Sequence, residues 1–336
     1  MKVLKWIGII VLVLILIIIV LALIAPRHYE VERTVLIDAP QEVVFMHVQY
    51  WSAWKDWSPW AEQDTAMVVS IEGEDGLKGS KYLWTGSPKI TGQGELENTG
   101  VKPNESIDYH QHFIKPMESH SDGYVRLSDV EGKTQVAWGM YGDMGFIWNI
   151  MLLFQPMDKM VDKDFTRGLE LLKGVVDEEM AAIKAFPIEK TLLSPISYVV
   201  IRKQATFGEL STFMGEAFGQ LMGQLAQAGK QPAGPPACLY YAWDMATAST
   251  DIAAAVPFTG KAPEGMEVVR LPSQSVYQGD YFGPYDKSGI AHWAFDFYLK
   301  DHGLEANPPM IETYFNSPMD EPDPAKLHTR ITYLVK

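Results

Sequence analysis

The chain has 336 residues, which is too long for one ordinary domain and fits two domains with an anchor. Apolar residues make up 47% of it and charged residues 21%, as in globular proteins, which excludes disorder over most of the chain. The net charge of −14 argues against nucleic acid as a partner, and the single cysteine, Cys238, excludes an internal disulfide and a cysteine-based zinc site.

An uncharged apolar run extends from Ile7 to Ala25. At a rise of about 1.5 Å per residue, a helix over this run spans the hydrocarbon core of a bilayer, which is about 30 Å thick. A cleaved signal peptide is the alternative, but its apolar region is normally about 7–15 residues long, and Pro26 sits where cleavage after Ala25 would need a flexible residue. We therefore expect residues 1–28 to be an uncleaved transmembrane anchor that contacts the lipid bilayer through residues 7–25.

Charges on either side of this run bear on its orientation. Lys2, Lys5 and the free amino group precede it, whereas Arg27 and Arg33 follow it among acidic residues. The positive-inside rule then favours a cytoplasmic N-terminus. We expect a single-pass protein of the bacterial inner membrane with its soluble domains outside the cytoplasm.

The part that follows the anchor predicts a curved sheet and a long helix. HYEVERTVLIDAP alternates like a strand, and a short helix then begins with Pro40 and Glu42 in its first turn. Several strand-like runs separated by Gly, Asn and Pro predict an antiparallel meander. From Asp158 to Ala185, apolar residues recur every three or four positions, so a helix there has one apolar stripe that must lie on the sheet. The pattern predicts a helix-grip arrangement with a cavity between the sheet and the helix.

Four ordered segments of this part carry a family resemblance. They are IDAPQEVVFMHVQYWSAWKDWSPW, GSKYLWTG, GKTQVAWGMYG and DFTRGLELLKGVVDEE. In this order they resemble the START-like (SRPBCC) superfamily, in its polyketide-cyclase-like branch, over residues 29–186. The resemblance implies a helix-grip domain whose relatives bind lipids, steroids or polyketides, so it specifies a fold more than a reaction.

The rest of the chain repeats a pattern of strand, helix, strand and strand. A Pro-punctuated linker is expected at residues 187–194, and a second domain at 195–336. The two repeats carry helices predicted over residues 209–228 and 284–302, each opening just after Phe-Gly. The predicted fold class is therefore α+β: a helix-grip domain and a duplicated β-α-β-β domain behind one N-terminal transmembrane helix.

Aligning the two repeats on their Pro-Pro pairs places an acid where the first repeat has a leucine. Leu239 then matches Glu312, and Tyr241 matches Tyr314. On a strand, residues two apart face the same side, so Glu312 and Tyr314 are expected to point together. Removing a carboxylate from water into an apolar strand costs about several kcal/mol unless the carboxylate is paired. Its presence there suggests a polar task for Glu312.

The second half resembles the GyrI-like family, the effector-binding domain of multidrug-responsive regulators. The segments DIAAAVPF, YQGDYFGPYDKSG and IETYFNSP carry the resemblance. It implies a buried glutamate in an aromatic-lined cleft that receives hydrophobic cations or flat ligands, and some relatives hydrolyse strained cyclopropane compounds. Glu312 takes the glutamate position, Tyr314 the aromatic that follows it, and Tyr285 lies in the family's Gly-Pro-Tyr turn. The DNA-binding module of the regulators has no counterpart, so nucleic acid is not an expected partner.

Glu312 has two interpretations. In the functional one, it lies in an apolar, ring-lined hollow without a counter-charge from its own chain, and it either donates a proton or captures a cation. In the other, it forms a structural salt bridge with Lys300 or Arg330.

The aromatic residues of this half also have two interpretations, as walls of a ligand cleft or as ordinary core. The candidate walls are Tyr241, Trp243, Phe282, Tyr285, Trp293 and Tyr314. The ligand-binding set is thus these six with Glu312, and the candidate catalytic pair is Glu312 and Tyr314.

Two further motifs lie in the first half. WSAWKDWSPW spaces tryptophans three apart, and it predicts a structural plug of the cavity more than a stacking platform for a ligand. His110 and His112 share one face of a strand, but no third ligand is evident near them, so no metal site is expected. No nucleotide loop, Ser-His-Asp arrangement or HExxH pattern occurs, and no cofactor is expected.

These observations favour a membrane-anchored protein that binds small hydrophobic molecules, cationic ones included, for sequestration or sensing. A hydrolase of strained or ester-like xenobiotics that uses Glu312 as general acid or base is the second hypothesis. A ligand-responsive interaction module is the third.

Overall fold

The computed structural model describes residues 2–244 and 247–336. The chain divides into two compact units, Met1–Glu178 and Glu179–Lys336, which are described separately. The boundary falls within the long helix α6 (Met157–Ala185).

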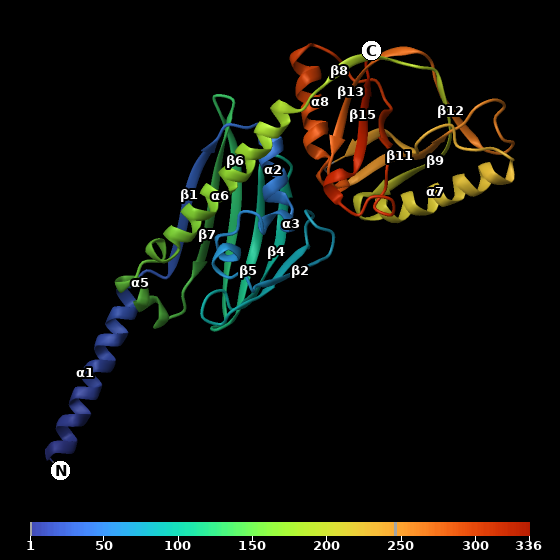
Figure 1. Ribbon diagram of the computed structural model, residues 1–336. Coiled ribbons are helices and arrows are strands. Elements are labelled where there is room, and N and C mark those ends of the chain that lie inside the picture. The colour runs from blue at the N-terminus through green and yellow to red at the C-terminus, as the bar shows by residue number, and fades with distance from the viewer. Residues whose placement is uncertain (1, 245–246) are drawn as a thin grey trace. The chain divides into compact units, whose positions relative to one another are not determined.

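The first unit begins with helix α1 (Lys2–Ile24), whose apolar side chains are mostly exposed (Figure 1). Over residues 2–244 and 247–336 it is the one helix long and apolar enough to cross a membrane, and a signal sequence meets the same criteria. Its end is tied to the unit by Asn149, a buried side chain whose Nδ2 donates to the carbonyl oxygens of Ala22 and Ala25 at 2.8 and 3.1 Å.

A curled, fully antiparallel sheet forms the body of the first unit, with the strand order β1-β7-β6-β5-β4-β3-β2. The predicted meander is confirmed, because consecutive strands from β2 to β7 are neighbours. The strands are β1 (His28–Ile37), β2 (Val68–Glu72), β3 (Lys81–Thr85), β4 (Gln93–Lys102), β5 (Ser106–Lys115), β6 (Ser119–Val130) and β7 (Lys133–Asp143).

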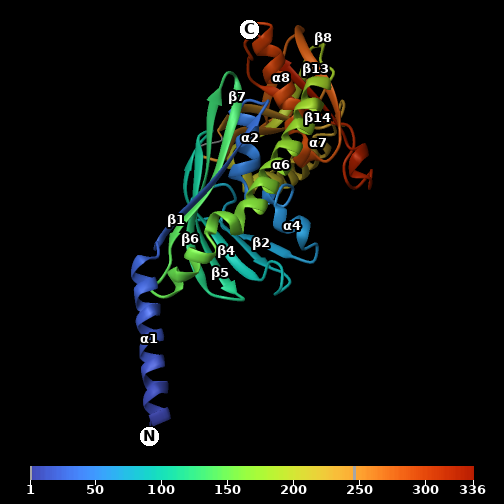
Figure 2. The same ribbon diagram turned by 90° about the vertical axis from the view of Figure 1, so that its left-hand side faces the viewer.

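Helix α6 crosses one face of this sheet (Figure 1 and Figure 2), and it confirms the helix predicted from Asp158 to Ala185. The ring of Phe165 on α6 stacks on Trp138 of β7 with centroids 4.4 Å apart. Gly168 permits this approach, because a Cβ there would lie 2.5 Å from Trp138 Cζ3. The other helices of this unit are α2 (Gln41–Gln49), α3 (Trp51–Trp54), α4 (Pro59–Gln63), η1 (Trp148–Ile150) and α5 (Met151–Phe154).

The second unit contains one sheet with the strand order β12-β9-β11-β10-β14-β15-β13-β8. The inner six strands are two groups of three, β9-β11-β10 and β13-β15-β14, that meet where β10 pairs with β14. The strands are β8 (Glu189–Leu193), β9 (Ile196–Thr206), β10 (Ala237–Asp244), β11 (Ser249–Pro257), β12 (Glu267–Leu271), β13 (Gln274–Phe282), β14 (Met310–Tyr314) and β15 (His328–Leu334). Residues 187–194, expected to be a linker, thus contain the edge strand β8, which pairs with β13.

Two helices cover one face of this sheet, α7 (Leu210–Gln227) and α8 (Gly289–Asp301), each preceded by a short 3₁₀ turn, η2 (Phe207–Glu209) and η3 (Tyr285–Lys287). Helix α7 packs on the first group of strands and α8 on the second. The other face packs into a separate apolar core that includes Leu239, Ile311 and Leu334. We call the face that α7 and α8 cover the helix face. The last turn in the chain is η4 (Pro324–Lys326).

Candidate functional site

Glu312 lies at the centre of the second unit's sheet, where the two groups of strands meet. In β14 it pairs with Cys238 of β10 on one side and with Ile331 of β15 on the other. Cys238 packs against α7 and Ile331 against α8, and directly paired residues share a face of a sheet. Glu312 therefore points from the helix face into the region between α7 and α8, and it is only 6% exposed.

Three side chains from three elements hold the carboxylate of Glu312. Nε2 of His292 on α8 lies 2.7 Å from Oε1, and the hydroxyl groups of Tyr314 and Tyr240 donate to Oε2 at 2.5 and 3.1 Å. Tyr314 follows Glu312 on β14 and Tyr240 is on β10. We call these four residues, Glu312, His292, Tyr314 and Tyr240, the glutamate cluster.

The predicted partners of Glu312 are elsewhere. Arg330 donates through two nitrogens to Asp280, both at 2.9 Å, on the face opposite the helices, and Lys300 is exposed on α8. The salt bridge with Lys300 or Arg330 is therefore wrong. The idea that the acid lacks a counter-charge in its own chain is also wrong, because His292 is an ionisable base in direct contact with it.

The environment of Glu312 favours its carboxylate form. Burial raises the pKa of this group, but the hydrogen bond and charge of His292, and then the hydroxyl groups of Tyr314 and Tyr240, outweigh burial. The pKa of Glu312 consequently lies below its ordinary 4.5. Burial and the nearby charge of Glu312 raise the pKa of Tyr240 and of Tyr314 well above 10, so both phenols stay protonated and donate.

His292 reaches Glu312 because of its phase on α8. It lies three residues before Phe295 and seven before Leu299, both buried against the sheet, so all three share the helix's inner side. Its other nitrogen, Nδ1, is 3.4 Å from the hydroxyl of Tyr333 on β15. The same spacing in the sequence indicates that His292 faces the sheet, although His292 is not among the predicted site residues.

Three of the predicted aromatic residues lie in or beside the glutamate cluster. Tyr314 belongs to it, and the ring of Tyr285 packs edge-on against Tyr314 with centroids 5.3 Å apart. Trp243 lies 5.9 Å from the ring of Tyr240, stacks on Phe207 at 4.3 Å, and is 53% exposed. Trp243 and Tyr285 therefore offer aromatic surface to solvent next to the buried acid.

The other predicted aromatic residues are not brought to Glu312. The ring of Tyr241 lies on the opposite face of the sheet, where the guanidinium of Arg202 sits 3.6 Å from its centroid. Phe282, also on the opposite face, stacks on His328 at 4.5 Å. Trp293 stacks on Phe297 along α8.

The register of β10 explains why Tyr240 replaces Tyr241. The alignment placed Leu239 and Tyr241 in the positions of Glu312 and Tyr314, but both lie on the face away from the helices. The residues of β10 that share the face of Glu312 are Cys238 and Tyr240. A bulge between Tyr240 and Ala242 adds one residue to β10 and so reverses the alternation of its side chains. Trp243 therefore lies on the same face as Tyr240.

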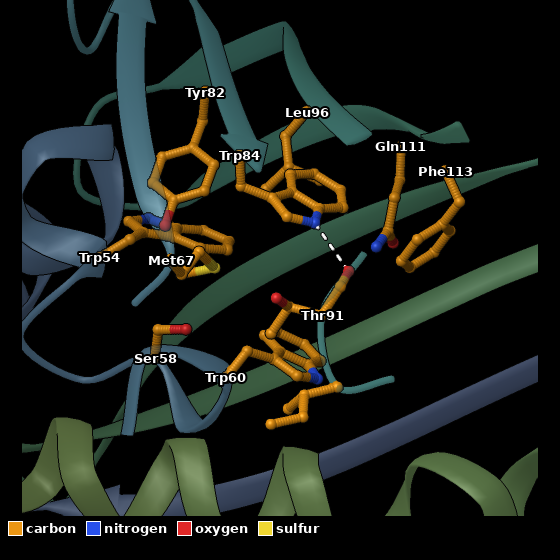
Figure 3. A pocket seen from close by; sticks show the side chains of 11 residues that line it. Trp54, Ser58, Trp60, Met67, Tyr82, Trp84, Thr91, Leu96, Gln111 and Phe113 are labelled. Carbon is orange, nitrogen blue, oxygen red and sulfur yellow. Dashed lines mark hydrogen bonds between the residues drawn. The ribbon is translucent and has the colours of Figure 1, made fainter. Parts of the chain in front are cut away.

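The first unit contains a second candidate site, a mostly apolar cavity of about 90 Å³ (Figure 3). Small-molecule sites usually measure about 300–1,000 Å³, so this cavity holds only a small ligand. In the figure, Trp84 donates through Nε1 to the carbonyl oxygen of Thr91 at 3.0 Å beside it. The cavity is lined by Trp54, Ser58, Trp60, Met67, Tyr82, Trp84, Ile90, Thr91, Leu96, Gln111 and Phe113.

The tryptophan-rich segment is mainly structural. Trp51, Trp54 and Trp57 are buried, and each indole N–H donates to a backbone carbonyl, of Ser80, Val48 and His47 respectively. Trp60 packs edge-on against Trp138 and lines the cavity with Trp54. These contacts agree with the predicted structural role of the segment, and its action as a plug of the cavity stays a prediction.

Comparisons with known proteins give several similar solved structures and one matching family model. No curated protein sequence matches the chain. The chain resembles the crystal structure of the EcmrR C-terminal domain, at 15% identity and a TM-score of 0.38, over 45% of this chain and 98% of that chain. It also resembles EcmrR in a cryo-EM structure of an EcmrR–DNA complex (17% identity, TM-score 0.40, 56% and 76% of the two chains) and protein CV1439 from Chromobacterium violaceum (15%, 0.34, 45% and 98%). The family model of the GyrI-like small molecule binding domain matches residues 186–336. Residues 186–336 of this chain therefore form a GyrI-like small molecule binding domain.

Proposed function

We propose that the protein is membrane-anchored and captures small hydrophobic molecules, cationic ones included, at the glutamate cluster, for sequestration or sensing. One observation carries this proposal: Glu312 is buried, its pKa is lowered, and aromatic rings border it. A carboxylate among aromatic faces attracts a hydrophobic cation, because both the charge and the ring quadrupoles favour it in a poorly solvated place.

The three hydrogen bonds of Glu312 leave one acceptor position of its carboxylate open. A carboxylate offers about four acceptor positions, and His292, Tyr314 and Tyr240 occupy three of them. A cation that approaches from the side of Trp243 and Tyr285 meets the remaining position or displaces the hydroxyl of Tyr240, which makes the longest of the three bonds.

A hydrolase that uses Glu312 is the second candidate. The lowered pKa of Glu312 makes it a poor proton donor near neutral pH, so it fits a general base better than a general acid. The 2.5 Å bond from the hydroxyl of Tyr314 favours this role, since it places a polarised hydroxyl next to the base. The third candidate, a ligand-responsive interaction module, would use the same cluster as its sensor.

We also infer that α1 is a transmembrane anchor, with the N-terminus in the cytoplasm and the soluble units outside it. An exposed apolar segment beside its end supports this inference. The guanidinium of Arg27 lies 5.3 Å above the ring of Phe146, and Asn149 holds the end of α1. We call the following residues the apolar foot, whose aromatic members suit a membrane–water interface: Phe146, Ile147, Trp148, Leu153 and Phe154.

We further infer that residues 29–186 form a START-like domain and that residues 195–336 are a duplicated β-α-β-β domain. The curled seven-stranded sheet with α6 across it supports the first inference. The strand order of the second unit, in which each group of three carries its own helix, supports the second.

Calorimetry and turnover assays on the full chain in detergent test the proposed function. The probes are ethidium, an aromatic cation, and pyrene, a neutral aromatic, with p-nitrophenyl butyrate as the ester substrate. We expect ethidium to bind and Glu312→Gln to weaken it about tenfold or more, equivalent to about 1.4 kcal/mol, with pyrene unaffected. Glu305→Gln, which changes an exposed acid of the same unit, is the control and should bind like the wild type.

Ester turnover that depends on Glu312 would favour the hydrolase instead. Ethidium binding that is equal in the wild type and in Glu312→Gln would contradict cation capture at Glu312, and ester turnover that is absent or independent of Glu312 would contradict the hydrolase.

A further inference from the structure

Imidazole and carboxylate groups gather on the hairpin formed by β5 and β6. His110 and His112 are on β5, His120 and Asp122 are on β6, and Glu118 lies in the connection between the strands. The register places His112 directly opposite His120, and His110 opposite Asp122. Sequence spacing showed no third ligand near the first two histidines, because cross-strand pairing supplies it.

The donor atoms of this group are close enough to share one ion. The donor atoms of His112, Glu118 and His120 lie within 4.8 Å of one another, and Nε2 of His112 is 3.5 Å from Oε1 of Glu118. The rings of His112 and His120 stack with centroids 4.1 Å apart. Nε2 of His110 is 3.1 Å from Nδ1 of His120, so a third imidazole borders the same point.

Two of the imidazoles have a carboxylate near their Nδ1 atom. Nδ1 of His110 lies 2.9 Å from Oδ1 of Asp122, and Nδ1 of His112 lies 3.9 Å from Oε1 of Glu95. In metal sites, a ligating imidazole typically gives its second N–H to a carboxylate, which fixes its orientation and increases its basicity. Nε2 of His112 is buried and has no hydrogen-bond partner within residues 2–244 and 247–336.

We propose that the β5–β6 hairpin binds a divalent transition-metal ion of the zinc type through His112, Glu118 and His120, with His110 as a fourth donor. Imidazole nitrogens with one carboxylate suit zinc, cobalt, nickel and copper, whereas calcium and magnesium prefer sites made only of oxygen. Zinc–nitrogen bonds of about 2.0–2.1 Å require the donors to draw closer than they are here, and the side chains of Glu118 and His120 are exposed at the surface, where they can move.

The proposed ion would fix the position of β5, a strand that also lines the cavity of the first unit. Gln111 and Phe113 of β5 line the cavity, and they alternate with His110 and His112, which therefore face the other side of the sheet. Joining β5, β6 and their connection through one ion stabilises the folded state by mass action.

The test uses the untagged full chain in detergent, treated with a chelator and then titrated with Zn²⁺ by calorimetry and with Co²⁺ by visible absorption. We expect one ion per chain, the intense visible bands of four-coordinate Co²⁺, and a rise in melting temperature with Zn²⁺. His112→Ala and His120→Ala should each weaken binding about a hundredfold or more. Glu118→Gln, which changes an exposed side chain, should weaken it about tenfold.

His28→Ala is the matched control, because His28 is an exposed histidine on β1 of the same sheet. Its affinity for Zn²⁺ should equal that of the wild type. The proposal is overturned if the wild type binds neither ion, or if binding persists unchanged in Glu118→Gln and in the His112→Ala His120→Ala double variant.

Discussion

Nε2 of His292 lies 2.7 Å from Oε1 of Glu312, which joins helix α8 to the central strand β14 across twenty residues of sequence. Burial raises the pKa of the acid, and among its partners His292 does most to lower it, which favours the ionised carboxylate. The proposed capture of cations depends on the ionised form.

Glu312 should make stability depend on acidity. Its pKa is lowered in the folded chain, so the folded state binds fewer protons there than the unfolded state. The contribution of Glu312 to the free energy of unfolding is therefore complete above about pH 4.5 and is lost as the pH falls through the folded-state pKa. Urea titrations of the wild type and Glu312→Gln between pH 7 and pH 3 should show a stability difference that shrinks below pH 4.5.

His292→Gln is the companion variant, since it keeps a hydrogen-bond donor but cannot carry a positive charge. It removes the largest contribution that lowers the pKa of Glu312, so the acid-side loss of stability should move to higher pH. An unchanged pH profile in this variant would show that His292 does not keep Glu312 ionised.

Two adjacent tyrosines give a matched pair for binding. Tyr240→Phe removes a hydroxyl that donates to Glu312, whereas Tyr241→Phe removes one on the other face of the sheet. We expect the affinity for ethidium to change about threefold or more in Tyr240→Phe, because the carboxylate gains a free acceptor position and loses a partner that stabilises its charge. Calorimetry should show no change for Tyr241→Phe, and equal effects of the two substitutions would place the ligand away from Glu312.

The tryptophan-rich segment should matter for folding. Trp51 is fully buried against Trp54 and Tyr109, so Trp51→Ala is expected to lower the free energy of unfolding by about 3–5 kcal/mol. Trp60→Ala should cost less, because Trp60 is only half-buried. Urea unfolding measures both, and a Trp51→Ala variant as stable as Trp60→Ala would contradict the structural role.

The apolar foot should contact lipid. A fluorophore attached through Trp148→Cys is expected to shift to shorter wavelength in nanodiscs and to be quenched by brominated lipid. The control is Val130→Cys, because the pairing of β1 with β7 places this turn at the far end of the sheet from α1. The natural Cys238 is buried and should label slowly. Equal quenching at the two positions, or none at Trp148→Cys, would argue against the foot.

Most elements of the fold could be predicted from local patterns. The helix predicted from the apolar stripe, Asp158 to Ala185, differs from the observed bounds of α6 by one residue. The two helices predicted after Phe-Gly correspond to α7 and α8. Such helices are predictable because their apolar spacing is a local property of the chain. Residues 189–193 were assigned to a linker, since an edge strand of five residues carries little pattern of its own.

The site was only partly predictable, because its partners meet through tertiary structure. Glu312 stood out as an acid in an apolar strand, but His292 comes from a helix and Tyr240 from a strand whose register an alignment on Pro-Pro pairs misjudged by one residue. A shift of one residue sends a side chain to the other face, which explains why Tyr241 was selected. Likewise, His120 meets His112 only through the pairing of β5 with β6.

Anomalous diffraction from crystals of the chain with a bromine-labelled aryl trimethylammonium ion tests the central claim most directly. We predict a bromine peak on the helix face between α7 and α8, with the ammonium group about 4–6 Å from the Glu312 carboxylate. A ligand seated only in the cavity of the first unit, or in the second unit with its ammonium group turned away from Glu312, would contradict it.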